Sequence, residues 1–253
     1  MTDTHAHLND ERFAGDLADT IARAAEKGVG SILVCGWDIP SGRQAADMAA
    51  AYPSVYAAAG VHPHDSESWS PEAAEDIREL SAKGRIVAVG EIGLDYYYDL
   101  EFRESQLVCF REQLKLSLEL DLPVSIHSRC AMEDTIGALR EYPGVRGVLH
   151  CFSGTMEQMS DLLDMGLYIG AAGPVTFKSS EDLRSVIRYV PADRLLLETD
   201  CPYMAPAPLR GRRNEPWMVC HVLEKMAGLL NMEPADLEAL TDDNARRLFG
   251  LRG

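Results

Sequence analysis

The chain has 253 residues, with 24 lysines and arginines against 40 aspartates and glutamates, so its formal net charge at pH 7 is −16. This charge argues against nonspecific binding of duplex nucleic acid through a broad basic face, but it leaves room for a local site where metal ions supply positive charge. Hydrophobic residues make up 46% of the sequence and charged residues 25%. These ordinary globular values exclude a disordered or collagen-like chain.

The sequence also predicts where the protein works. No apolar run reaches the roughly 18 residues that span a bilayer. The first eleven residues lack the basic and apolar regions of a signal peptide. The six cysteines form no CxxC pair, so we expect reduced, mostly buried thiols rather than disulfides or a cysteine-rich zinc site. We therefore expect a cytoplasmic protein with no membrane association and no obligate protein partner.

Short apolar or β-branched runs alternate with longer amphipathic segments along the whole chain. The eight candidate strands cover residues 2–5, 31–36, 55–61, 86–91, 123–127, 147–151, 167–170 and 195–200. Helical periodicity or a first-turn proline predicts helices over residues 16–27, 71–83 and 101–120. Two further helical segments cover residues 217–230 and 235–248.

Eight strands alternating with helices over about 250 residues predict an α/β fold, a (β/α)₈ TIM barrel with extra C-terminal helices. A doubly wound open sheet shares the alternation and is the rival fold. The sequence contains no linker, low-complexity stretch or internal repeat, so we expect a single domain over residues 1–253.

Metal-ligating residue types recur where predicted strands stop. They are His5, His7, His62, Glu91, His127, His150 and Asp200. In a barrel the carboxyl ends of all strands converge on one face, whereas residues from distant strands of an open sheet could not meet. The pattern therefore favours a barrel with a metal site at that face. Imidazole and carboxylate ligands suit zinc, manganese or iron and do not resemble a calcium cage.

This set is larger than the three protein ligands of a single catalytic zinc, and it suffices for two metals that share a carboxylate. Two cations about 3.5–4 Å apart can clamp the attacking and leaving oxygens of a displacement and activate a bound water. Such chemistry is hydrolytic. The sequence has no GxSxG elbow, Walker loop or HExxH motif, so serine-hydrolase, NTPase and zincin functions have no support.

Seven motifs follow one another in the order DTHAH (3–7), GVHP (60–63), GEIGLD (90–95), HSR (127–129), HCFSG (150–154), ETDCP (198–202) and RGRRNEP (210–216). This series resembles that of TatD-type deoxyribonucleases, which belong to the metal-dependent amidohydrolase superfamily. The resemblance implies a TIM barrel and a divalent-metal-dependent enzyme that hydrolyses phosphodiester bonds in DNA through a metal-bound hydroxide, cutting from a strand end.

The resemblance also implies two ligand sets that share Glu91. One set comprises His5, His7, Glu91 and Asp200, and the other comprises Glu91, His127 and His150. The expected cofactors are two divalent ions, with Mg²⁺ or Mn²⁺ for activity and Zn²⁺ as a bound form. The implied catalytic residues are Glu91, Asp200 as the base for the attacking water, and His62, which touches the phosphate or leaving group without binding metal.

Basic residues in predicted loops on the same face are candidates for binding DNA. They are Arg129, Lys178 and the cluster of Arg210, Arg212 and Arg213, of which Arg129 and Arg210 are the strongest candidates. An arginine offers a two-pronged fork to phosphate oxygens, and the alternative for each residue is an ordinary solvated loop.

Other acidic and aromatic residues near these motifs have open roles. Asp95 either orients a ligand histidine or caps the next helix. Glu198 lies two residues before Asp200, so the two side chains face the same side of an extended segment. Two roles for Glu198 stay open, support of a metal ligand and contact with the phosphate. The tyrosines at 96–98 either stack unpaired bases or pack a loop.

Two alternatives to a nuclease acting on DNA strands or ends stay open. The same metal site could hydrolyse a carboxylic ester or amide, as an aminoacyl-tRNA deacylase does. The chain could also be a non-catalytic metal-binding scaffold, although the complete ligand set argues against that.

Overall fold

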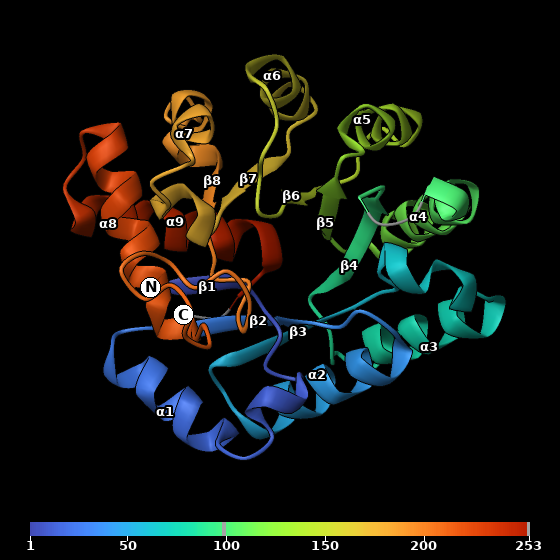
Figure 1. The fold of residues 1–253 in the computed structure, drawn as a ribbon. Coiled ribbons are helices and arrows are strands. Elements are labelled where there is room, and N and C mark those ends of the chain that lie inside the picture. Colours follow the sequence, from blue (N-terminus) through green and yellow to red (C-terminus); the bar gives the residue numbers. More distant parts are fainter. Residues whose placement is uncertain (98–99, 252–253) are drawn as a thin grey trace.

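Eight parallel strands form the centre of the molecule and follow one another in space in their sequence order (Figure 1). The computed structural model describes residues 1–97 and 100–251. The strands are β1 (Thr2–Ala6), β2 (Ser31–Cys35), β3 (Val55–Ala59), β4 (Ala88–Asp95), β5 (Val124–Arg129), β6 (Gly147–Leu149), β7 (Tyr168–Ala171) and β8 (Leu195–Leu197). Each strand pairs with the next in parallel register.

The end of β1 meets the segment that follows β8, which closes the barrel. Ala6 and Cys201 form a parallel bridge. The His7 amide donates to the Cys201 carbonyl at 2.7 Å, and the Asp200 amide donates to the His5 carbonyl at 2.9 Å. The (β/α)₈ prediction is therefore confirmed over the open sheet, which would leave β1 and β8 apart.

Helices surround the strands on the outside (Figure 1). They are α1 (Leu17–Glu26), α2 (Ile39–Ala51), α3 (Pro71–Ala82), α4 (Arg103–Leu120), α5 (Met132–Glu141), α6 (Met156–Asp164), α7 (Glu181–Ile187), α8 (Val219–Leu230) and α9 (Pro234–Phe249). Short 3₁₀ turns lie at Glu11–Phe13, Pro63–Ser68, Leu100–Phe102, Gly173–Thr176, Ala192–Arg194 and Pro216–Met218. As predicted, α3 begins at a first-turn proline, with the Ser70 hydroxyl accepting the Ala73 amide.

Strand lengths differ from the prediction in a way that matters for function. β4 and β5 continue beyond Glu91 and His127, so both residues lie inside strands, whereas β6 and β8 end before His150 and Asp200. In β4 the register slips between Val89 and Ile92, where three residues of β4 match two of β5. This bulge gives Glu91 its own direction, because a bulged residue leaves the ladder and re-aims its side chain.

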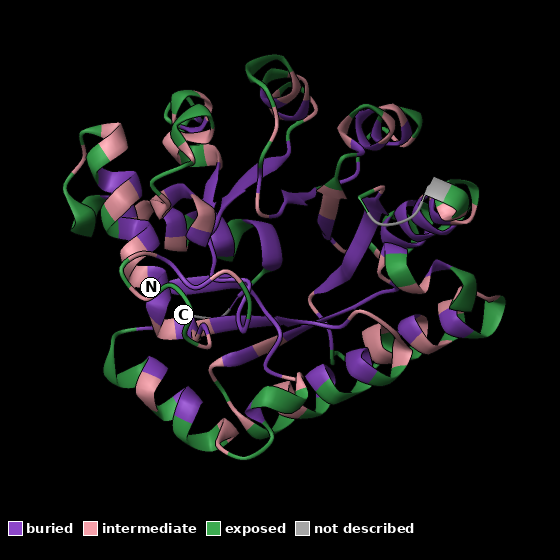
Figure 2. Cartoon of the chain, in the orientation of Figure 1, coloured by how far each residue is buried: buried purple, intermediate pink, exposed green. Residues whose placement is uncertain are grey.

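Burial is nearly complete along the strands and one-sided on the outer helices (Figure 2). A first apolar cluster joins strand residues such as Ile32 and Val34 to the helices. The alternate residues Leu33 and Cys35 belong to a second cluster, which also contains Phe249 of α9.

Helix α9 closes the amino-terminal end of the barrel. The buried amide of Asn244 donates to the carbonyls of Ala192 and Leu195, just where β8 begins. The site must therefore open at the carboxyl end. Within the described part of the chain, no helix has the length and apolarity to cross a membrane.

Candidate metal centre

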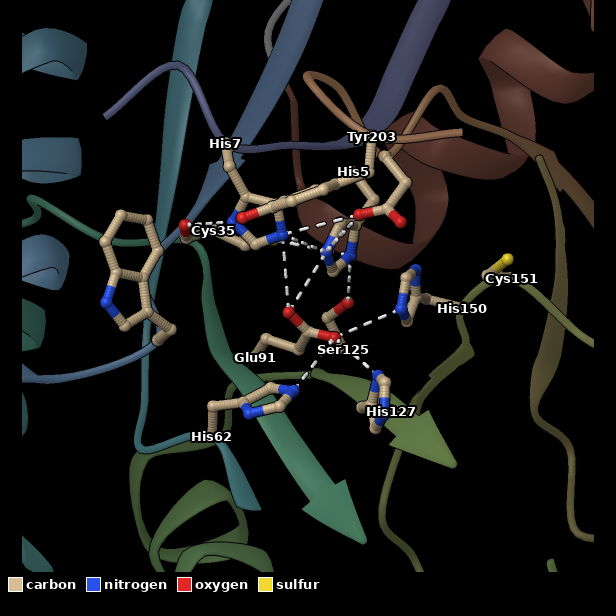
Figure 3. A network of polar contacts seen from close by, with 12 residues as sticks. His5, His7, Cys35, His62, Glu91, Ser125, His127, His150, Cys151 and Tyr203 are labelled. Carbon is tan, nitrogen blue, oxygen red and sulfur yellow. Dashed lines mark hydrogen bonds and ion pairs between the residues drawn. The ribbon is translucent and has the colours of Figure 1, made fainter. Parts of the chain in front are cut away.

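The predicted ligands, which are up to 195 positions apart in the sequence, meet at the carboxyl end of the barrel (Figure 3). β1 carries His5 and leads into His7, β4 carries Glu91, and β5 carries His127. His150 and Asp200 directly follow β6 and β8 in the chain. All except His127 are buried.

The carboxylate of Glu91 lies at the middle of the group, and its two oxygens face different histidines (Figure 3). Oε2 is 3.4 Å from the Nε2 atoms of both His5 and His7. Oε1 is 3.0 Å from Nδ1 of His127 and 3.1 Å from Nε2 of His150. One carboxylate therefore stands between two pairs of imidazoles, which is the position of a bridging ligand.

Asp200 lies on only one side of Glu91. Its Oδ1 is 3.4 Å from Nε2 of His7 and 4.0 Å from Nε2 of His5. Asp200 adopts a left-handed backbone conformation with φ of 57°, which aspartate tolerates better than most residues.

Each of three histidines contacts a polar atom on the side of its ring that faces away from the centre. His5 Nδ1 is 3.0 Å from Ser125 Oγ, and His7 Nδ1 is 3.0 Å from the Cys35 carbonyl oxygen. His127 Nε2 is 3.1 Å from Asp95 Oδ2. Such contacts fix the tautomer and ring orientation of metal-binding histidines. Asp95 thus contacts His127, as the first of the two roles considered for it requires, and its Oδ1 also accepts the Tyr97 amide.

The hydrogen bonding of His62 differs from that of the four histidines predicted as ligands. The His64 backbone N–H donates to His62 Nδ1 at 3.1 Å, so that nitrogen is unprotonated. Burial lowers the pKa of His62 to about 3. A neutral ring then carries its proton on Nε2, which lies 3.9 Å from Glu91 Oε1. His62 thus presents a hydrogen-bond donor to the centre, not a lone pair.

The electrostatics of the centre favour positive charge. Burial alone raises the pKa of Glu91, but the charges of His5 and His150 outweigh it and hold this pKa well below its usual value. Burial alone lowers the pKa of His7, but hydrogen bonds to Asp200 and Glu91 raise it to about 10. The carboxylates thus attract protons onto the imidazoles, and divalent cations supply the same positive charge.

The donor set fits divalent cations. Three groups of side chains each have their donor atoms within 4.8 Å of one another. They are His5, His7 and Asp200; His5, His150 and Glu198; and His62, Glu91 and His127. Imidazole nitrogens and carboxylate oxygens are donors that suit divalent metal ions. The first group lies within one of the two predicted ligand sets, whereas the other two contain Glu198 and His62, which were not predicted as ligands.

The basic candidates lie outside this centre. The Arg129 guanidinium carbon is 3.7 Å from the centre of the Tyr97 ring, and that of Arg210 is 3.7 Å from the centre of the Phe177 ring. Lys178 is exposed, and its carbonyl accepts from Arg184. Of the tyrosines at 96–98, Tyr98 lies outside the described residues.

Sequence reasoning missed two groups that support the ligands. Ser125 was not singled out, although a residue two positions before His127 in a strand faces the same side. The Cys35 carbonyl carries no side-chain signal at all. Trp37 and Tyr203, which flank the His7 ring at centroid distances of 5.8 and 6.1 Å, were also missed.

A closed eight-stranded parallel barrel with four imidazoles and two carboxylates at its carboxyl end defines a metal-dependent hydrolase. The chain belongs to the TatD related DNase family, whose family model matches residues 2–250. The resemblance and the expected class of enzyme, a TatD-like metal-dependent hydrolase, are therefore confirmed. The match does not favour the ester or amide hydrolase or the non-catalytic scaffold.

Individual relatives cover almost the whole chain. It is 43% identical to the "Uncharacterized metal-dependent hydrolase YabD" of Bacillus subtilis, over 98% of both chains. It is 40% identical to the "3'-5' ssDNA/RNA exonuclease TatD" of Klebsiella pneumoniae, over 99% of this chain and 98% of that one. The crystal structure of YJJV, a TatD homologue from Escherichia coli, superposes with a TM-score of 0.94 at 32% identity, over 100% and 98% of the two chains.

Proposed function

We propose that this chain is a two-metal exonuclease that removes nucleotides from the 3′ end of single-stranded DNA. The observation that carries the proposal is the position of Glu91, whose two oxygens face two separate pairs of histidines. The name of the Klebsiella relative, a 3′–5′ exonuclease for single-stranded DNA and RNA, supports the polarity and the strand preference.

The residues divide between two ions. His5, His7 and Asp200 would hold the first, His127 and His150 would hold the second, and Glu91 would be shared by both. When bound, the two cations polarise the phosphodiester and lower the pKa of an attacking water. Mg²⁺ or Mn²⁺ is the proposed working metal, and Zn²⁺ is a tight-binding alternative, because histidine-rich sites bind zinc strongly.

The protein supplies proton transfer and hydrogen bonding around the phosphate. Asp200 would orient the attacking water and accept its proton, since its Oδ1 contacts His7 of the first ligand set and a carboxylate at the edge of a metal site can act as a general base. His62 donates its Nε2–H to a phosphate oxygen or to the leaving oxygen. A neutral donor preorganised in a buried site stabilises developing negative charge without reorganisation.

A cleft of about 600 Å³ between the segments that follow His127 and His150 offers the DNA strand a place. Its lining includes Ser128 and Arg129, which directly follow His127, and Ser153, which follows His150 by three residues. We place a backbone phosphate against Arg129 and an unpaired base against Tyr97, because arginine and aromatic side chains bind single strands in this way. Arg210 and Lys178 are proposed to contact the strand on the opposite rim.

An end-label assay tests the proposal. Linear single-stranded DNA labelled at its 5′ end should shorten progressively when Mg²⁺ or Mn²⁺ is added, and EDTA should stop the reaction. Circular single-stranded DNA should resist. Cutting of the circle, or faster turnover of an ester panel than of DNA, would contradict the proposal.

The same assay tests the strand-binding cleft. Arg129→Ala should raise KM about 10- to 100-fold with little change in kcat, because a hydrogen bond to a charged group contributes about 1.5–3 kcal/mol. Arg78→Ala is the matched control, since Arg78 pairs with Glu119 on the outer helices. The arrangement of residues 1–253 as one domain and the cytoplasmic location stay predictions.

A further inference from the structure

Glu198 is a completely buried acidic residue that the proposed reaction does not use. Its exposed fraction is 0%. Its Oε1 accepts the backbone N–H of Cys151 and lies 3.4 Å from Nδ1 of His150. Its Oε2 is 3.5 Å from the Thr4 hydroxyl. A carboxylate is removed from water only at considerable cost, so a role for its charge is expected.

The neighbouring histidine needs an acceptor at this point. His150 Nδ1 is buried and makes no hydrogen bond among the described residues, while its Nε2 lies 3.1 Å from Glu91. An imidazole that binds a cation through Nε2 carries its proton on Nδ1, and a buried N–H without an acceptor is unfavourable. The carboxylate of Glu198 is an acceptor near that nitrogen, with Oε1 at 3.4 Å, and a small rotation of the ring would bring the two into a hydrogen bond.

The backbone of β7 passes close to the carboxylate of Glu198. A β-carbon at Gly170 of β7 would lie 2.7 Å from both oxygens of Glu198, closer than real contacts allow. The Gly170 carbonyl also accepts the Phe152 amide at 3.0 Å, which ties the segment after His150 to β7. Glycine at 170 thus lets Glu198 approach the His150 segment.

A third metal ion is the other chemistry that these residues suggest, because donor atoms of His5, His150 and Glu198 lie within 4.8 Å of one another. The rings of His5 and His150 are stacked, however, with centroids 3.8 Å apart and an angle of 16° between planes. Imidazole lone pairs lie in the ring plane, so one cation cannot meet both rings. His5 Nδ1 is moreover 3.0 Å from Ser125 Oγ.

We propose that Glu198 is the positioning residue for His150: it accepts the Nδ1–H, fixes the tautomer and aims Nε2 at the second ion. The inference rests on the proposed two-ion site. It predicts that Glu198 controls the affinity of one ion and leaves the other unchanged, since only His150 among the proposed ligands forms an ion pair with it in the described chain.

Titration of the metal-free protein with Co²⁺ or Zn²⁺ tests this inference, with calorimetry to count ions and the cobalt absorption spectrum to distinguish them. Wild type should bind two ions. Glu198→Gln should weaken one of them about 10-fold, because a neutral amide is a poorer acceptor than a carboxylate. Glu198→Ala should weaken the same ion about 100-fold, the upper part of the range for such supporting residues.

Ser125→Ala is the matched control, because Ser125 supports His5 and should therefore affect the other ion. In the zinc-loaded wild type, imidazole ¹⁵N spectra should show the Nδ1–H form of His150. Two ions bound by Glu198→Gln with wild-type affinities would overturn the inference, and thermal unfolding of the metal-free variant checks its folding. A wild type that binds two ions but does not cut DNA would count against the proposed function only.

Discussion

Replacing Glu91 with glutamine exchanges a single carboxylate oxygen for an amide nitrogen, and we expect this change to abolish cutting. The carboxylate is 4% exposed, and its two oxygens lie 3.0–3.4 Å from four imidazole nitrogens. In glutamine one of those oxygen positions becomes an NH₂ group that cannot bind a cation. The bridging charge is lost at the same time.

The magnitude follows from the proposed ligand sets. Glu91 is one of four ligands of the first ion but one of only three of the second, so the second ion should be lost first. Removing a single electrostatic stabiliser costs about 3–4 kcal/mol. Perturbing both ions should therefore cost about 6–8 kcal/mol, or roughly 10⁴- to 10⁶-fold in rate.

Single-turnover cutting of end-labelled single-stranded DNA measures this loss, and metal analysis of the same samples counts the ions. Glu79→Gln is the control, because Glu79 is exposed on the outer helix α3, where it pairs with Lys83, and undergoes the same chemical change. If Glu91→Gln keeps two ions and more than one tenth of the wild-type rate, the bridging position of Glu91 has been misinterpreted.

Three further changes test other parts of the structure. His62→Leu should leave the metal content unchanged and lower kcat roughly 100-fold, because one preorganised donor is lost; loss of an ion would show that His62 is a ligand. Burial raises the pKa of the Cys109 thiol to about 12, so folding favours its protonated form and this contribution to stability should decline from about pH 9 to pH 12. Denaturant titrations across that range should show a smaller loss in Cys109→Ala than in the wild type, because burial also raises the pKa of other thiols, such as Cys35 and Cys201. Asn244→Ala should cost about 2–4 kcal/mol of unfolding free energy, since the buried carbonyl of Leu195 and the half-buried carbonyl of Ala192 lose their donor, and calorimetry should detect this without a change in kcat.

The barrel could be predicted because the carboxyl ends of all strands in a parallel barrel lie on one face. Polar residues at strand ends that are far apart in the sequence therefore meet there. His127 lies in β5 and His150 directly follows the neighbouring strand β6, and each was recognisable as a polar residue at the end of an apolar run. The bulge at Glu91 could not be seen in this way, because the glycine-rich stretch at 90–93 has the same apolar pattern as a regular strand. Register depends on the paired strand and therefore on tertiary structure.

The supporting atoms were mostly beyond sequence reasoning. The Ser125 hydroxyl that faces His5 is 120 positions away, and the Cys35 carbonyl that faces His7 is 28 positions away. The loops of the rim lack any periodicity, so the sequence could not predict that Arg213 would pair with Asp16 and Glu215. Its neighbour Arg210 instead stacks on Phe177.

The two proposed ions receive negative charge in different ways. The first has Asp200 as a ligand, and the partners behind its histidines are the neutral Ser125 hydroxyl and Cys35 carbonyl. The second has no carboxylate of its own besides the shared Glu91. Its histidines are instead backed by carboxylates, with Asp95 behind His127 and Glu198 behind His150.

Because of this difference, we expect the two ions to have different roles in the reaction. A carboxylate ligand can leave one oxygen for a water and its proton, as the first ion requires for attack on phosphorus. A carboxylate behind an imidazole strengthens and orients that ligand without taking a coordination position itself, so the second ion would keep more positions for the substrate. Neutralising a charged partner, for example with Asp95→Asn, should therefore weaken binding of the second ion. Proton transfer through Asp200 should stay intact.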